Sequence, residues 1–120
     1  PSTGSNYQNV DDGVTDDGDS TYNSSNTTND VDLYEMGNLA STVGNIKGAK
    51  FSYVSRKDDA GSRSLAGVVR SAGTDYVQAT QAQSTTKAVY TDYLLTDPAT
   101  STAWTITTIN AVESGIKLIV

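Results

Sequence analysis

Short alternating segments separated by turn signals are the feature that most constrains how this chain folds. Between residues 45 and 95, segments such as "NIKGAKFSYVSRKD" and "SRSLAGVVRS" are bounded by the turn signals "DDAG" and "SAGTD". Alternation with a period of two is typical of half-buried β-strands, and Gly and Asp at the breaks favour tight turns. Since 120 residues correspond to one domain by length, we expect a single all-β domain.

Four consecutive segments in this region predict an antiparallel meander, and they cover residues 45–58, 62–71, 75–80 and 86–95. A bulge at Gly48 would bring Ile46 onto the same face as the alternating residues that follow it. The fourth segment has apolar residues on both faces, which predicts a strand covered on both sides. Two further short strands are expected earlier in the chain, around Tyr22 and over residues 31–36.

The last twenty-five residues, "TDPATSTAWTITTINAVESGIKLIV", predict how the fold is closed. Pro98 favours a turn, and Thr105 suits the N-cap of a short helix whose apolar residues recur every three positions. Gly115 is expected to stop that helix. A final apolar strand over 116–120 is expected to enter the middle of a sheet, with Trp104 plugging one end of the core.

Together these patterns predict an antiparallel, jelly-roll-like β-sandwich with one short helix before the final strand. We expect residues 31–120 to form the sandwich. Residues 1–30 are expected to be a polar, acidic leading segment that packs along the sandwich or extends from it. The predicted core residues are Phe51, Tyr53, Trp104, Ile109, Ile116 and Leu118.

The charge is unevenly distributed and excludes some functions. The net charge is −6, and residues 1–32 hold seven acidic residues and no Lys or Arg. Residues 33–120 hold eight basic and seven acidic residues, a net charge of +1. Nucleic-acid binding needs clustered basic residues, so we expect no nucleic-acid partner. No apolar run in the sequence is long enough to cross a membrane, so no membrane partner is expected either.

Catalytic chemistry has few candidates, because the sequence contains no Cys and no His. This excludes disulfides, thiol nucleophiles, the usual general base and the usual zinc ligands. The two glutamates, Glu35 and Glu113, could in principle form a glycosidase pair, but solvated surface positions are the favoured interpretation. No P-loop, dinucleotide-binding or nucleophile-elbow motif is present, so we expect no enzyme and no bound cofactor.

Three clusters are candidates for binding. Five aspartates lie close together and could hold a structural calcium ion, although the EF-hand spacing is absent and a solvated acidic loop is the favoured interpretation. Arg56, Lys57 and Arg63 flank an acidic turn and are expected to pair with it or with a neighbouring subunit. Tyrosines could stack on sugars, which would suit a carbohydrate-binding module for host-surface glycans. The five aspartates are Asp11, Asp12, Asp16, Asp17 and Asp19, and the tyrosines are Tyr7, Tyr22, Tyr34, Tyr53, Tyr76, Tyr90 and Tyr93.

The C-terminal segment resembles a signature of tailed-bacteriophage virion proteins. There, a D-P-A-T-G turn precedes a Trp-Thr pair, a short helix with Asn-Ala, and a Gly-plus-apolar final strand. The upstream stretches "YQNVDD", "DGDSTYNSS", "DVDLYEMGNL" and "RKDDAGSRS" also match that pattern. The family has Gly where this chain has Ser101, so the turn there is expected to differ in backbone angle.

The resemblance implies a jelly-roll or lectin-like sandwich carried on a phage capsid, tail or fibre. It implies a non-enzymatic structural role on the surface of a virion, as in capsid decoration, head fibres or tail fibres. The expected partners are capsid or tail subunits and further copies of the chain on a symmetric lattice. Carbohydrate binding to host-surface glycans is the alternative function.

Overall fold

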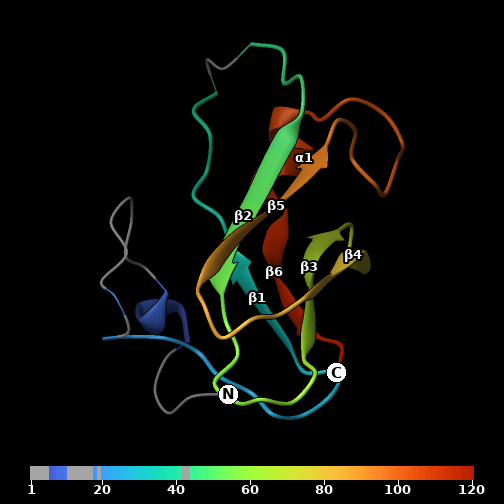
Figure 1. The fold of residues 1–120 in the computed structure, drawn as a ribbon. Helices are drawn as coiled ribbons and strands as arrows, with labels where there is room; N and C mark the ends of the chain where they lie inside the picture. The colour runs from blue at the N-terminus through green and yellow to red at the C-terminus, as the bar shows by residue number, and fades with distance from the viewer. Residues whose placement is uncertain (1–5, 11–17, 19, 42–43) are drawn as a thin grey trace.

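The computed structural model describes residues 6–10, 18, 20–41 and 44–120. It confirms the expected class: the described residues form antiparallel sheets with one short α-helix before the last strand (Figure 1). The elements are η1 (Asn6–Asn9), β1 (Val31–Glu35), β2 (Ala49–Ser55), β3 (Ser64–Ser71), β4 (Thr74–Ala82), β5 (Ala88–Leu94), α1 (Ile106–Asn110) and β6 (Glu113–Leu118).

The strands form one sheet in the order β1-β6-β3-β4 and a second sheet of β2 and β5. In Figure 1, the β2–β5 pair crosses in front of the larger sheet. The last strand, β6, lies between β1 and β3, as the sequence predicts. The predicted meander is wrong, because β2 pairs with β5 and not with β3. The connections 56–63 and 83–87 are long enough to carry the chain from one sheet to the other, whereas β3 and β4 are joined by a tight turn.

The β3–β4 hairpin turns at Ala72 and Gly73, which both have positive φ, at 49° and 77°. This is the pattern of a type I′ turn, whose twist matches that of the flanking strands. The ladder shifts register between Ala66 and Val68, leaving one extra residue in β4. The bulge expected at Gly48 is not found, since Gly48 precedes β2.

The core lies between the two sheets around Val69, Trp104 and Val112, all at most 3% exposed. Ile46, Ala49, Phe51, Leu94 and Ile109 pack against this cluster. Among the residues expected in the core, Trp104 and Leu118 are buried, while the other four are half-buried; these are Phe51, Tyr53, Ile109 and Ile116.

Sequence reasoning missed the central position of β3. Ala66, Val68 and Val69 are each at most 1% exposed, although they are consecutive or nearly so along the strand. The burial of consecutive residues shows that both faces of β3 are covered, while β6 and β4 pair with its two edges. Val112, which follows the helix, is also buried, although it is not among the predicted core residues.

The helix begins as predicted and ends earlier. Thr105 is the N-cap, and its side chain and that of Thr108 form a reciprocal capping box. The helix ends at Asn110, so Gly115 does not stop it. Instead Gly115 lies inside β6, where an added Cβ would be 1.8 Å from the carbonyl oxygen of Asp32. Glycine is needed there because the backbone of β1 approaches too closely for any side chain.

The described part of the leading segment lies against β1. Asn6 and Asn23 donate hydrogen bonds to Asp32 Oδ2 at 2.9 and 3.1 Å, and Tyr34 donates to the same oxygen at 2.6 Å. The strand expected around Tyr22 is wrong, because residues 20–30 contain no strand. Polar side chains in this stretch bond to other side chains and loops in place of a sheet ladder. None of the helices in the described residues has the length and apolar character needed to span a membrane.

Candidate protein-binding face

The β2–β5 sheet is covered on one side and open on the other. Along β2, Ala49, Phe51 and Tyr53 are half-buried, while the alternate residues are exposed. On β5 the side chains facing away from the core are also largely exposed, so the expectation that this strand is covered on both sides is wrong. We define the outer face as Lys50, Ser52, Val54, Val89, Thr91 and Tyr93, with Leu95 directly after it.

Apolar side chains dominate this outer face. Val54 is 52% exposed, Val89 69%, Tyr93 73% and Leu95 75%. The register pairs Val54 with Val89, Ser52 with Thr91, and Lys50 with Tyr93. The Ser52 and Thr91 hydroxyl oxygens lie 3.0 Å apart and hydrogen-bond to each other, so the polar residues in the middle of the face satisfy one another. The remaining surface is apolar and basic.

A groove adjoins the outer face at Leu95. Its volume is about 560 Å³, and it lies between residues 44–47 and residues 103–106. Trp104, which lines the groove, is nearly buried and donates from Nε1 to the carbonyl oxygen of Leu94 at 2.9 Å. The exposed apolar surface therefore continues from the sheet to the end of the molecule that Trp104 closes.

A second, more polar groove brings the two glutamates together. Glu35 and Glu113 are directly opposite each other in the β1–β6 ladder and line a space of about 280 Å³ with Asn38 and Asn110. Glu113 is the first residue of β6. Sequence spacing gave no sign of this pairing, because the two residues are far apart along the chain.

Arg70 lies close to one of these two carboxylates and offsets the repulsion between them. Arg70 Nη1 lies 3.3 Å from Glu113 Oε2, and the same guanidinium holds Asp75 through two contacts, at 2.5 and 3.0 Å. Like charges directly opposite in a ladder are destabilising, and Arg70 offsets that repulsion.

Asn110 receives a hydrogen bond from Leu39 N at 2.8 Å, so it fastens the segment after β1 to the helix end.

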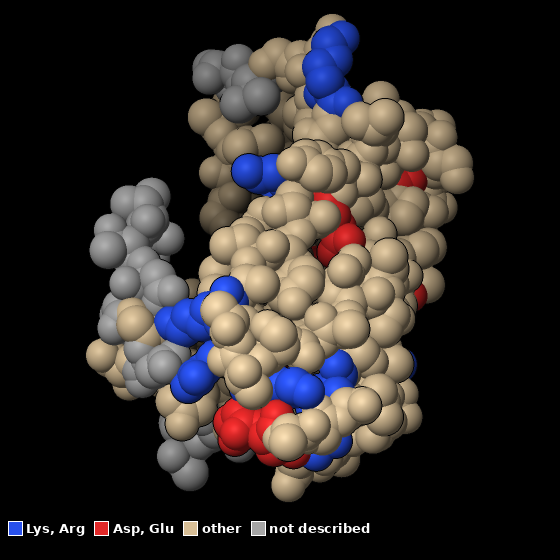
Figure 2. Space-filling view, viewed as in Figure 1, with Lys and Arg blue, Asp and Glu red and all other residues tan. Residues whose placement is uncertain are grey.

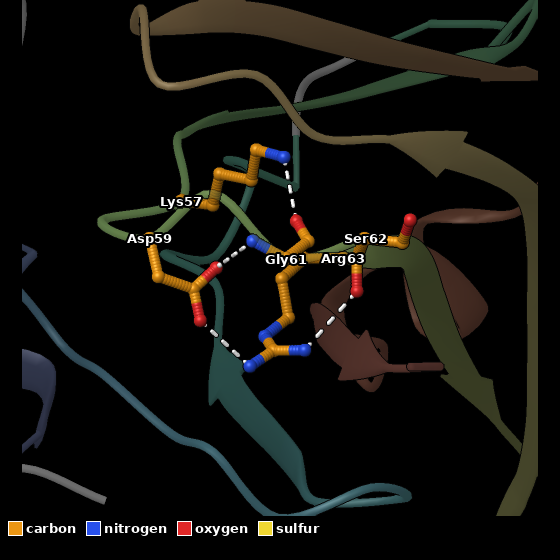
Figure 3. A network of polar contacts seen from close by, with 5 residues as sticks. All are labelled: Lys57, Asp59, Gly61, Ser62 and Arg63. Carbon is orange, nitrogen blue, oxygen red and sulfur yellow. Dashed lines mark hydrogen bonds and ion pairs between the residues drawn. The ribbon is translucent and has the colours of Figure 1, made fainter.

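The acidic turn between β2 and β3 binds its own basic neighbours (Figure 3). Arg63 pairs with Asp59 at 2.7 Å, and Lys57 donates to the carbonyl oxygen of Gly61 at 2.6 Å. Asp59 also accepts from the backbone N–H of Gly61 at 2.9 Å, which closes the turn. The expected pairing of Lys57 and Arg63 within the turn is therefore observed, and these cations serve the loop's own structure.

Only some of the tyrosines that could stack on sugars are exposed. Tyr7, Tyr22 and Tyr93 are 61%, 60% and 73% exposed and could stack on a ligand. The other four are half-buried, and they are Tyr34, Tyr53, Tyr76 and Tyr90. Burial and the hydrogen bond to Asp32 raise the pKa of Tyr34, so this side chain serves as a donor in the network that ties the leading segment to β1.

A polar cluster missed at the sequence level lies between the sheets. Tyr53 and Tyr90 stack with ring centroids 5.4 Å apart. Burial, with a further contribution from Asp92, raises the pKa of Tyr53 to about 12, although the backbone of Gly67 opposes this. That backbone approach does not satisfy hydrogen-bond geometry, and the buried Tyr53 hydroxyl has no hydrogen-bond partner among the described residues.

Asp92 lies beside this pair because Gly67 leaves room for it. A Cβ on Gly67 would be 2.1 Å from Asp92 Oδ2. Burial raises the pKa of the Asp92 carboxyl. The sequence signals for this cluster were Gly67 within an otherwise apolar strand and Asp92 within another strand. Nothing in the sequence showed that these two strands face each other.

The C-terminal motif is occupied with structural contacts. Asp97 is 1% exposed, and its Oδ1 accepts from Ser71 Oγ at 2.7 Å and from Ala99 N at 3.0 Å. Ser101, at the position where the family has Gly, has a φ of 57°. Ser101 therefore lies in the left-handed region that favours glycine.

The five aspartates of the candidate calcium site lie outside the described residues, so a structural calcium ion stays a prediction. The described residues contain no group of three or more side chains suited to hold a metal ion. Comparisons of the chain with protein-family models, with curated proteins and with solved structures found no match. The resemblance to phage virion proteins thus also stays a prediction.

Proposed function

We propose that the chain is a non-enzymatic structural component of a bacteriophage virion. It acts through protein–protein contacts, as a capsid decoration, head-fibre or tail-fibre domain does. The observation that carries the proposal is the outer face, where Val54, Val89 and Tyr93 are all more than half exposed on one side of a two-stranded sheet. Clustered exposed apolar side chains of this kind mark protein interaction surfaces.

The contacts of the C-terminal motif also support a scaffold role. Asp97, Trp104 and Gly115 each fix backbone or close the core. A motif of this kind maintains a rigid body that can be carried in many copies. Weak contacts are sufficient on a symmetric particle, because many of them act together.

Particle incorporation tests this proposal. Mass spectrometry of purified phage particles should detect the chain at a fixed ratio to the major capsid or tail protein. Val89→Ser combined with Tyr93→Ser should lower that ratio, since it removes apolar contact area from the outer face. Val77→Ser is the control, because Val77 is 46% exposed on β4, in the other sheet. A chain that is absent from particles would contradict the proposal.

Glycan binding is the second candidate, and the groove of Glu35 and Glu113 favours it. Carboxylates and the amide of Asn38 line this groove, and such groups hydrogen-bond to sugar hydroxyls. A glycan array would test it with the unmodified protein, Glu35→Gln and Tyr93→Ala. Loss of a specific sugar signal in Glu35→Gln alone would place the sugar in the groove, while loss in Tyr93→Ala alone would place it on the outer face. A blank array for the unmodified protein would exclude this candidate.

A further inference from the structure

The outer face is positively charged as well as apolar. Lys50 is the one charged residue among its six defining positions, and Arg56 and Lys87 flank it where β2 ends and β5 begins. Lys47 lines the adjoining groove at the other end. In Figure 2, much of the surface in front of β2 and β5 is tan, with Lys and Arg atoms toward its upper and lower ends and Asp and Glu atoms near its middle and at its lower end. A partner for this face must therefore combine acidic groups with some apolar contact.

The chain carries such a partner in its own leading segment. Residues 1–32 hold seven acidic residues and no basic residue, and Val10, Tyr22 and Val31 lie among them. The structure shows one contact between the two regions, since Lys87 Nζ donates a hydrogen bond to the carbonyl oxygen of Gly18. The leading segment thus meets the basic end of the outer face within a single chain.

The rest of the face is not covered by any residue that the structure describes. The described part of the leading segment is held against β1, in the other sheet, by the hydrogen bonds of Asn6 and Asn23 to Asp32. With the segment held there, Val89, Tyr93 and Leu95 stay at least 69% exposed. The apolar part of the face, with Lys50 beside Tyr93, is therefore available to another molecule.

We propose that the outer face of the β2–β5 sheet binds the acidic leading segment of a second copy of the chain. The two surfaces differ, so each copy gives its segment to one neighbour and receives a segment from another. Contacts of this head-to-tail type build rings or open assemblies, not closed pairs. The inference rests on the proposed structural role, since it names the partner that occupies the face through which that role is exercised.

Mixing two complementary variants tests the contact directly. The face variant carries Lys50→Glu and Tyr93→Thr, and the segment variant carries Asp→Asn at positions 11, 12, 16, 17 and 19. Each variant alone should be monomeric in sedimentation velocity. An equimolar mixture should form a heterodimer and nothing larger, because one intact face and one intact segment remain. Native mass spectrometry would identify one copy of each variant in that species.

Three measurements keep the outcome unambiguous. Thermal melts should show that both variants remain folded, and the control Val77→Thr with Thr80→Glu, on β4, should associate like the unmodified protein. Raising the NaCl concentration from about 50 mM to about 500 mM should weaken association about tenfold or more, because charge contacts at a surface are screened. An association unaffected by salt would contradict the role of the acidic segment.

Two results would overturn the inference. If the unmodified protein associates but the mixed variants stay monomeric, the faces bind each other or another surface. If the unmodified protein is monomeric at millimolar concentration, the outer face does not bind a second copy. Detection of the chain in purified particles would, in either case, leave the proposed structural role intact, whereas absence from particles would remove that role.

Discussion

Ser71 Oγ donates a 2.7 Å hydrogen bond to Asp97 Oδ1, and both side chains are buried at 4% and 1% exposure. The bond joins the end of β3 to the turn that precedes Trp104. The same carboxylate oxygen accepts from Ala99 N at 3.0 Å, so one side chain fixes both the turn and its attachment to the larger sheet.

Replacing Asp97 should therefore destabilise the whole domain. Asp97→Ala removes the acceptor of the buried Ser71 hydroxyl and of the half-buried Ala99 N–H, and we expect a loss of about 2–4 kcal/mol in the free energy of unfolding. Urea denaturation would measure it. Asp58→Ala, in the exposed turn, should change stability by less than about 0.5 kcal/mol. Equal effects of the two variants would show that the buried bond contributes nothing.

Trp104 should contribute through packing more than through its hydrogen bond. Trp104→Phe retains most of the apolar volume but loses the bond to the Leu94 carbonyl, at an expected cost of about 1–3 kcal/mol. Trp104→Ala removes the side chain from the core cluster and should cost about 3–5 kcal/mol. Thermal melts of both variants would show the order. A smaller loss for the alanine variant would contradict the role of Trp104 in closing the core.

The Gly115→Ala variant tests whether Gly115 is needed for the close approach of β1 to β6. In β6 its Cβ position is 1.8 Å from the Asp32 carbonyl oxygen, so Gly115→Ala must push β1 away from β6. We expect a loss of several kcal/mol or failure to fold, measured by circular dichroism and urea denaturation. Gly37→Ala is the control, because nothing lies within 4 Å of the added Cβ. Near-native stability of Gly115→Ala would place β1 elsewhere.

The buried Tyr53 hydroxyl should make stability sensitive to high pH. Because burial raises the pKa of Tyr53 to about 12, above its usual value of about 10, the folded state favours the protonated phenol. That stabilisation is complete below about pH 10 and is lost as the pH rises toward 12. Tyr53→Phe should be as stable as the unmodified protein at pH 7, or more stable, and should lose less stability between pH 10 and 12. Parallel losses in both proteins would contradict this.

Asp92 should also make the protein less stable as the pH rises, but in a lower pH range than Tyr53. Burial raises the pKa of its carboxyl above the usual value of about 3.9, so its contribution is most favourable below that value and declines as the pH rises. Asp92→Asn should therefore be more stable than the unmodified protein at pH 7, and the difference should shrink toward pH 4. Urea denaturation at several pH values would measure it. A variant that is less stable at pH 7 would show that the carboxylate is paired when charged.

Features set by neighbouring residues could be predicted from the sequence. The alternation within residues 45–58 located β2, and Thr105 as an N-cap residue located the start of the helix. The pairing of β2 with β5 could not be predicted, because the connections on either side of the β3–β4 hairpin are long enough to permit several arrangements. The prediction that Gly115 stops the helix was wrong because a glycine that ends a helix and a glycine that permits close strand approach look alike in sequence.

The candidate face was harder to predict than the fold. Val89 and Tyr93 belong to a segment with apolar residues on both sides, which usually indicates a covered strand. Only the three-dimensional arrangement shows that one side of β5 meets the core and the other meets solvent. The meeting of Glu35 with Glu113 likewise depends on the β1–β6 register, which joins residues from distant parts of the chain.

The position of β6 has a consequence for biosynthesis. Among the strands of the described residues, β6 comes last along the chain, yet it lies between β1 and β3. Until residues 113–118 leave the ribosome, β1 has no neighbour in its sheet, and one edge of β3 is open. The nascent polypeptide therefore exposes two unpaired strand edges until then, and a chain truncated before Glu113 would be prone to aggregation.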